Sequence, residues 1–236
     1  YRNMIEKVNK AFQILSLEGI PLGKVDIPFK YIISGINKYE SFRIGAGLQT
    51  NSLFSKWFSV GGFAGYGLRD KAFKYGGNIQ FNIQQRTNTV LRFDYSRDIT
   101  EPGNVDYFVH NGSVFSNQSL RNFQRSRFDS VEQFKINFST KIRPAIQTDI
   151  WLMNEARNPA VYDYEFANNG TNFHGFKNTE LGIGFRLTKD ESFTRIGRAK
   201  LRTKPATTEL LFQISKGLKN VLNGDLDYTK LAIRFS

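Results

Sequence analysis

The chain has 236 residues, no cysteine and a formal net charge of +12, with 22 phenylalanines against 2 tryptophans. This length suits one large domain or two small ones, and the lack of cysteine excludes disulfides and thiolate metal sites. The mean hydropathy is −0.41 and no run of about eighteen apolar residues occurs, so the sequence predicts no transmembrane helix. A transmembrane β-barrel is still compatible with this hydropathy, because its lumen positions are polar.

The first predicted element is a short helix. Met4, Val8, Phe12 and Leu15 recur at helical spacing before Gly19. We therefore expect residues 1–18 to form an amphipathic helix or linker. Its polar face is not richly basic, so packing on the domain that follows is favoured over a position at a membrane interface or in a barrel mouth.

Period-two alternation dominates the chain after the predicted helix. In the clearest run, residues 73–84, apolar side chains alternate with Lys, Gly, Asn and Gln, so a strand there has one apolar and one polar face. Its length fits strands that cross a bilayer, which need about 9–11 residues, better than the usual five or six of globular domains. The same pattern predicts strands over residues 42–49, 56–68, 91–96, 134–139, 142–153, 180–187, 209–215 and 230–235.

The connections between these strands are of two kinds. Short turns are predicted at residues 69–71, 85–88, 141–144 and 223–225, and long polar loops at residues 99–130, 154–176 and 189–205. Outer-membrane barrels have short turns on one side and long loops on the other, so the pattern favours a barrel. A soluble secreted β-sandwich or β-rich binding module is the alternative, because its strands also alternate, with their apolar faces buried between two sheets.

In a barrel, the polar positions of the strands line the lumen. The candidate lumen-lining residues are Arg43, Lys74, Asn78, Gln80, Asn82, Arg92, Asp94, Lys135, Glu180, Arg186, Lys230 and Arg234. The basic members exceed what Asp94, Glu180 and Glu209 can neutralise, so we expect a lumen that favours anions, or loops that contact lipopolysaccharide phosphates. The basic residues are scattered instead of gathered in one patch, which argues against nucleic acid as a partner.

No catalytic, cofactor-binding or metal-binding arrangement is recognisable. His110 and His174 lack a second His or Cys at ligand spacing, and no nucleophile–base arrangement supports an outer-membrane lipase or protease. The Gly-x-Gly pairs, such as Gly182 and Gly184, lack the third glycine of a dinucleotide loop. They are expected either to allow strand curvature or to give room to bulky neighbours on the lumen face. We therefore predict no enzyme, no cofactor and no metal site.

A group of carboxylates lies in and after the strand predicted at residues 91–96. Asp94, Asp98, Glu101 and Asp106 match the spacing of no calcium loop. We expect them to form salt bridges with Arg92 and Arg97 instead.

Residues 39–76 carry a longer pattern. It comprises Glu40-Ser41-Phe42-Arg43-Ile44-Gly45-Ala46-Gly47 with Thr50, followed by Tyr66-Gly67, Asp70 and Lys74-Tyr75. The pattern resembles the barrel part of a family of large Gram-negative outer-membrane proteins of unassigned function. Those proteins join an N-terminal carboxypeptidase-regulatory-like domain to a C-terminal barrel similar to the outer-membrane assembly and two-partner secretion superfamily. Ser41 stands where that family often has glycine.

The resemblance implies an all-β fold, an antiparallel transmembrane β-barrel in the outer membrane. Residues 19–236 would be a barrel segment of on the order of ten strands, with an N-terminal domain and C-terminal strands missing. Open sheet edges are unstable in lipid, so we expect a longer native chain, or several chains that close the barrel together. The implied function is non-enzymatic, in envelope biogenesis, transport or protein translocation.

The implied partners are outer-membrane lipid, lipopolysaccharide and proteins of a membrane complex. The arginine-containing loop motif of the assembly superfamily does not occur in this segment, so a translocation role does not follow from the resemblance by itself.

Overall fold

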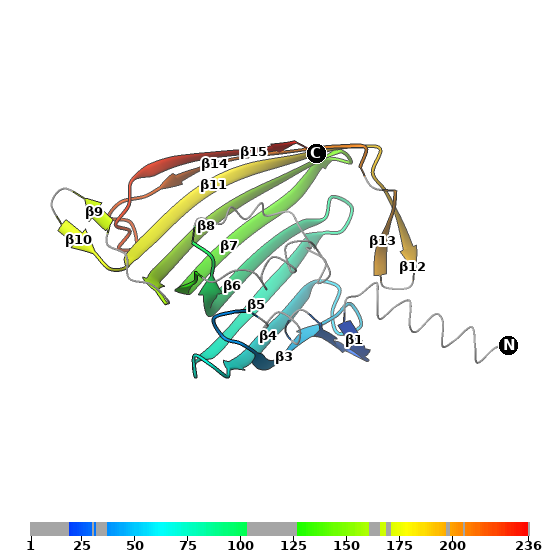
Figure 1. Ribbon diagram of the computed structural model, residues 1–236. Helices are drawn as coiled ribbons and strands as arrows, with labels where there is room; N and C mark the ends of the chain where they lie inside the picture. Colours follow the sequence, from blue (N-terminus) through cyan, green and yellow to red (C-terminus); the bar gives the residue numbers. More distant parts are fainter. Residues whose placement is uncertain are drawn as a thin grey trace.

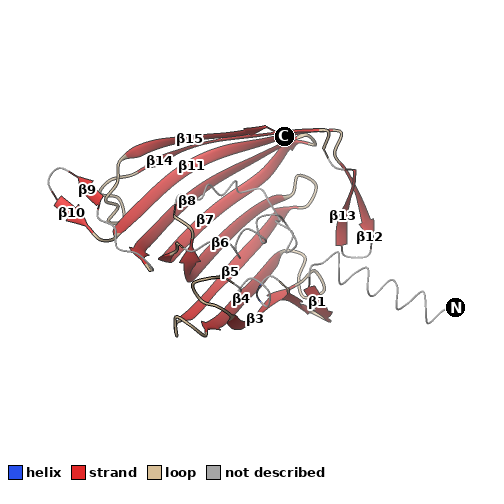
Figure 2. Cartoon of the chain, in the orientation of Figure 1, coloured by secondary structure: helices blue, strands red, loops and turns tan. Residues whose placement is uncertain are grey.

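The computed structural model describes residues 19–29, 31, 37–102, 127–160, 166–168, 171–196, 199–204 and 206–235. These residues are predominantly β-strand, so the predicted all-β class is confirmed (Figures 1 and 2). The strands are β1 (Gly19–Leu22), β2 (Val25–Pro28), β3 (Arg43–Thr50), β4 (Phe58–Gly67), β5 (Phe73–Gln84), β6 (Thr89–Thr100), β7 (Asp129–Arg143), β8 (Ile146–Pro159), β9 (Phe166–Asn168), β10 (Thr171–Phe173), β11 (Phe176–Lys189), β12 (Ser192–Ile196), β13 (Ala199–Lys204), β14 (Thr208–Gly217) and β15 (Tyr228–Phe235).

Two of the sequence predictions concern helices. The helix predicted over residues 1–18 lies outside the described residues. Within the described ranges, no helix is long and apolar enough to cross a membrane.

One large antiparallel sheet contains most of the strands. Its eleven strands follow the order β1-β2-β3-β4-β5-β6-β7-β8-β11-β14-β15, so every strand pairs with its neighbour along the chain once the small hairpins are set aside. The hairpins β9–β10 and β12–β13 form separate two-stranded sheets. Figure 1 shows a curved sheet with β1 and β15 at its two edges. These edges do not pair with each other, so the sheet is open and does not close into a barrel.

The strands agree with the predicted alternation but several are longer. β5 has the predicted bounds, whereas β6, β7 and β8 contain 12, 15 and 14 residues and extend well beyond the alternating cores. The strand predicted over residues 142–153 is wrong at its start, because the chain turns at residues 144–145 between β7 and β8. The β1–β2 hairpin was not predicted.

The long connections lie at both ends of the sheet, which corrects the predicted asymmetry. We call the end where β3 and β5 begin the Glu40 end, because Glu40 precedes β3. Antiparallel order places the connections after β4, β6, β8 and β14 at the Glu40 end, where a short turn and long segments occur together. The predicted loop at residues 189–205 lies at the opposite end and contains β12 and β13, as Figure 1 shows. Loop length alone therefore does not distinguish two sides.

Cross-strand register aligns the apolar residues of neighbouring strands into continuous rows on one face. One such row crosses eight strands, from β4 to β15, and all its members are apolar. It consists of Phe58, Phe81, Leu91, Phe138, Ile150, Ile183, Ile214 and Leu231. We call the surface that carries this row the apolar face and the opposite surface the polar face.

Burial on the two faces is the reverse of that in a water-soluble sheet. Apolar side chains such as Ile44 (60% exposed), Phe81 (44%) and Leu231 (59%) lie open, whereas Asp129 and Asp149 on the polar face are fully buried. The other fully buried side chains are Glu40 in the turn before β3 and Thr179 near the start of β11. Among the described residues, the buried hydrophobic core is confined to Phe128, Val131, Trp151 and Leu211. The interior of this fold is thus built mainly from polar contacts.

Candidate functional site

The predicted lumen-lining residues all lie on the polar face. The register places Asn78, Asp94 and Lys135 side by side on β5, β6 and β7, and Gln80 beside Arg92. The same parity applies to Arg43, Lys74, Asn82, Glu180, Arg186, Lys230 and Arg234. Arg43, Lys74, Asn78, Glu180 and Arg186 are buried there. The structure brings several of these residues together in separate networks.

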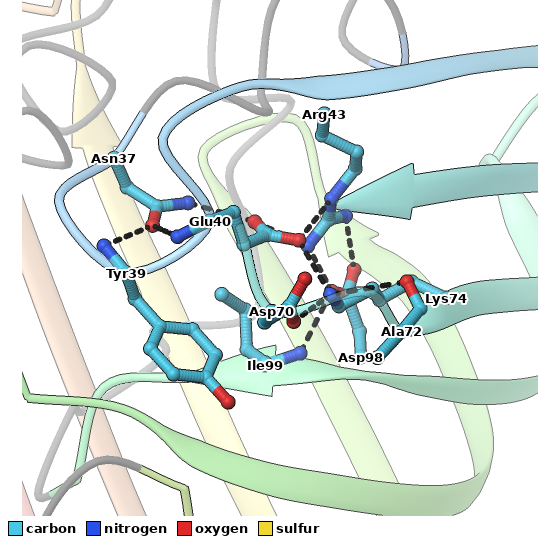
Figure 3. A network of polar contacts seen from close by, with 9 residues as sticks. All are labelled: Asn37, Tyr39, Glu40, Arg43, Asp70, Ala72, Lys74, Asp98 and Ile99. Carbon is cyan, nitrogen blue, oxygen red and sulfur yellow. Dashed lines mark hydrogen bonds and ion pairs between the residues drawn. The ribbon is translucent and has the colours of Figure 1, made fainter. Parts of the chain in front are cut away.

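The densest network surrounds Glu40 at one end of the polar face (Figure 3). The Arg43 guanidinium donates from Nε to Glu40 Oε1 and from Nη2 to Glu40 Oε2, both at 2.9 Å. Lys74 Nζ lies 2.8 Å from Glu40 Oε1 and also contacts Asp70. Arg43 reaches Asp98 on β6 as well, 2.5 Å from Nη2 to Oδ1. We call these five charged residues the Glu40 cluster.

A tight turn presents Glu40 to its partners. Asn37 Oδ1 accepts hydrogen bonds from the backbone N–H groups of Tyr39 (2.9 Å) and Glu40 (2.8 Å), while Asn37 Nδ2 donates to Glu40 Oε2 at 2.7 Å. Ser41 then adopts a left-handed backbone with φ of 65°. This conformation favours glycine, so Ser41 is held in a backbone geometry that costs energy for a residue with a Cβ atom.

The cluster determines the charge state of Glu40. Burial alone would raise the pKa of its carboxyl, but the hydrogen bonds from Arg43, Lys74 and Asn37 and the charge of Arg43 outweigh burial and lower the pKa. Burial and the nearby Asp70 carboxylate raise the pKa of the Tyr39 hydroxyl. Glu40 is therefore held as an anion in a site closed to solvent.

A second network covers the polar face between β8 and β15. Glu180 accepts from Trp151 Nε1 at 3.0 Å and from the Tyr228 hydroxyl at 2.6 Å. Lys230 Nζ lies 3.6 Å from Glu180, and Asn178 donates to the Tyr228 hydroxyl at 3.0 Å. These contacts join three strands through one buried carboxylate.

Two further ion clusters lie toward the ends of the strands. Arg157 bridges Asp129 and Glu155, each at 3.2 Å. Arg186 forms a bidentate contact with Glu191 at 2.9 and 3.0 Å and a 2.5 Å contact with Glu209. The two clusters add four charges that the sequence prediction had not counted on or beside the polar face, namely Arg157, Asp129, Glu155 and Glu191.

The prediction of a cation-rich lining needs correction on this point. It compared the number of basic lumen residues with only three carboxylates, Asp94, Glu180 and Glu209. The structure adds carboxylates that lie in or beside the polar face and neutralise the predicted cations, namely Glu40, Asp70, Asp98 and Glu191. The described face therefore carries interleaved charges of both signs.

The salt bridges expected for the carboxylates in and after β6 are confirmed in one case and wrong in another. Asp94 pairs with Arg92 at 2.7 Å, as expected. Asp98 pairs with Arg43 and not with Arg97, because side chains alternate along β6 and Arg97 points to the opposite face. Asp106 lies outside the described residues.

Glycines on the polar face make room for large rings, which is one of the two explanations that the sequence left open. A Cβ atom at Gly182 would lie 2.1 Å from the Trp151 ring, and one at Gly47 would lie 2.2 Å from the Tyr31 ring. Tyr31 in turn stacks on Phe63, with ring centroids 4.8 Å apart. The small residues of β3 and β11 therefore let aromatic side chains lie flat against the sheet.

A hollow of about 470 Å³ opens on the polar face between β3 and β7. Its charged lining comes from Arg43, Arg92, Asp94, Asp98 and Lys135, and its apolar lining includes Tyr31 and Phe63. Within the described ranges, no three His, Cys, Asp or Glu side chains are grouped to hold a metal ion, and His174 is exposed.

Sequence reasoning missed most of the acidic partners and the tryptophan contact. The pattern over residues 39–76 did contain a signal, because its charged positions Glu40, Arg43, Asp70 and Lys74 are the members of the Glu40 cluster apart from Asp98. Nothing in the sequence placed Asp98, which lies 55 residues after Arg43 and meets it through the sheet register. Trp151 was predicted only as part of a strand.

Comparison with known proteins adds no family assignment. The sequence matches no protein-family model, and none of the curated proteins is similar enough to it to count as a match.

Proposed function

We propose that this chain forms the wall of a non-enzymatic transmembrane β-barrel in an outer membrane, with a role in envelope biogenesis, transport or protein translocation. The observation that carries the proposal is the reversed burial of the sheet. A contiguous apolar surface of this kind is rare on soluble monomers and marks contact with a membrane or a partner. Lipid chains can cover an apolar face that extends over eight strands, so no second layer of protein is needed.

The dimensions of the apolar face support this assignment. On β7 the apolar face carries Phe134, Ile136, Phe138, Thr140 and Ile142. These positions span roughly 27 Å along the strand and about 20 Å along the barrel axis after a tilt of about 40°, comparable with the apolar band of about 25 Å in known barrels. The charged Glu132 lies one position beyond, opposite Arg97 of β6.

Aromatic residues near the strand ends support the same orientation. Tyr66 and Phe73 lie next to each other at the Glu40 end, with ring centroids 4.9 Å apart, and Phe73 is 70% exposed. Trp57 and Phe58 occur at the opposite end, where Trp57 is also 70% exposed. Aromatic girdles of outer-membrane barrels occupy these positions, whereas a β-sandwich would bury them between its sheets.

The polar face then becomes the lumen wall. Shifting the apolar row by one residue gives a row that is mostly polar, with Ser59, Gln80, Arg92, Asn137, Trp151, Gly182, Ser215 and Lys230. Side chains inside a curved wall converge and can satisfy one another, which accounts for the Glu40 and Glu180 networks. The edges β1 and β15 are where further strands or further copies would complete the wall.

Fractionation of cells that express the full-length protein tests the proposal. We expect recovery in outer-membrane fractions after carbonate washing, and faster gel migration of the unheated protein than of the boiled protein. Recovery from the soluble fraction, with migration that heating does not change, would contradict membrane insertion.

A further inference from the structure

The hollow between β3 and β7 has the features of a small-molecule site. Its volume of about 470 Å³ falls within the range of about 300–1,000 Å³ that is typical of ligand pockets. Small residues of β4 and β5, Gly65 and Gly77, form part of its wall, and Tyr31 borders it. The hollow is therefore concave, partly aromatic and lined by a few charged groups.

Two of the three cations in its wall are already neutralised. Arg43 contacts both Glu40 and Asp98. Arg92 binds Asp94 through Nε, at 2.8 Å to each carboxylate oxygen, and through Nη2 at 2.7 Å. These two arginines keep little charge for a ligand.

Lys135 differs from the two arginines. It lies on β7 directly opposite Asp94, but the Asp94 carboxylate is occupied by Arg92. Throughout the described part of the chain, no carboxylate lies within ion-pair distance of the Lys135 ammonium group. The Asp149 carboxylate on β8 acts on Lys135 at longer range, so Lys135 presents to the hollow a positive charge that no direct ion pair holds. An oxyanion in the hollow is attracted more strongly than at an open surface, because the protein lowers the local dielectric constant.

A second polar group borders the same hollow. Asn78 lies in the same cross-strand row as Asp94 and Lys135 and is 7% exposed. Its Oδ1 has no hydrogen-bond partner among the described residues, and a buried acceptor is costly to leave unpaired. The oxygen itself is closed to solvent, so the Asn78 side chain has to turn toward the hollow before a hydroxyl group on a bound solute can supply the donor. Ser96 and Gln133 add further polar groups to the wall.

We propose that this hollow binds a small polyhydroxylated solute that carries one oxyanion, either a carboxylate or a phosphate. Lys135 pairs with the oxyanion, and the Asn78 amide oxygen and the Asp94 carboxylate accept hydrogen bonds from solute hydroxyl groups. The inference rests on the proposed barrel only in placing the hollow on the lumen side.

Four probes of similar size test the charge preference. We propose equilibrium dialysis of the detergent-folded full-length protein with glucuronate, glucose 6-phosphate, glucose and glucosamine. At least one of the two acids should bind about tenfold or more tightly than glucose, and glucosamine should bind no better than glucose. Glucuronate alone would assign the site to carboxylates, and glucose 6-phosphate alone to phosphates. Equal binding of all four sugars, or binding of neither acid, would overturn the proposal.

Variants locate the binding at Lys135. Lys135→Gln should weaken binding of the acid about tenfold, whereas Lys135→Arg should retain it. Lys189→Gln, at the exposed far end of β11, is the matched control and should bind like the wild type. Unchanged binding in Lys135→Gln would refute the assignment. If Lys135→Gln fails to fold, binding of the four sugars to the wild type still tests the charge preference. Heat-modifiable gel migration of the same samples tests the barrel fold separately.

Discussion

Replacement of Glu40 by glutamine removes one charge from the most buried network of the protein. The Glu40 side chain is fully buried and accepts contacts from Arg43, Lys74 and Asn37. Removing one partner of a buried ion pair costs about 3–5 kcal/mol. Arg43 keeps Asp98 and Lys74 keeps Asp70, so we expect the lower end of this range, about 3 kcal/mol, for Glu40→Gln.

The pH dependence of this loss provides a second, independent signature. The folded-state pKa of Glu40 lies below its ordinary value of 4.5, so its charge stabilises the fold at all pH values above that value. The contribution falls as the pH drops below 4.5 and disappears once the pH passes the lowered folded pKa. The difference between wild type and Glu40→Gln should therefore be constant near neutral pH and shrink in acid.

Urea unfolding of both proteins in lipid vesicles, followed by tryptophan fluorescence between pH 3 and pH 8, measures both effects. Asp98→Asn is the matched control, since Asp98 is 30% exposed and contacts Arg43 from the other side. A Glu40→Gln variant within about 0.5 kcal/mol of the wild type at pH 7, the range typical of surface substitutions, would refute the buried-cluster reasoning. So would a difference that stays constant down to pH 3.

Three further substitutions test other parts of the fold. Phe81→Arg should destabilise the protein in vesicles by about 2–4 kcal/mol, whereas Asn82→Arg on the opposite face should cost clearly less in the same folding titration. Gly182→Val would collide with the Trp151 ring and should cost about 1–3 kcal/mol in urea unfolding, and an unchanged midpoint would contradict the packing. Ser41→Gly relieves a left-handed backbone and should raise stability by about 1 kcal/mol, and a loss of stability would contradict the turn conformation.

The alternating pattern predicted most of the central sheet because side-chain period is a local property. β5 was predicted with its observed bounds, and every predicted lumen-lining residue shares the polar face. The ends of β6, β7 and β8 were not predicted, because polar residues on the apolar face, such as Glu132 and Asn154, break the alternation there. Arg97 and Thr179 interrupt the alternation in the same way, and their positions are set by pairing with neighbouring strands.

The charged networks could be predicted only in part, because they depend on strand register. The spacing of Glu40 and Arg43 is local, and Lys74 reaches them through the turn between β4 and β5. The contact of Asp98 with Arg43 requires four strands to pair in one particular register. The same is true of Glu180, which meets Trp151 and Tyr228 from strands on either side.

The central claim is that the apolar face meets lipid, and spin labels along β5 test it most directly. The chain has no cysteine, so single cysteines can be introduced and labelled at each position from Asn78 to Asn82 in protein folded into vesicles. We predict that labels at Ile79 and Phe81 are accessible to oxygen dissolved in lipid, and that labels at Asn78, Gln80 and Asn82 are shielded from it. Access of a water-soluble nickel chelate to Ile79 and Phe81, as strong as its access to exposed turn positions, would contradict the account.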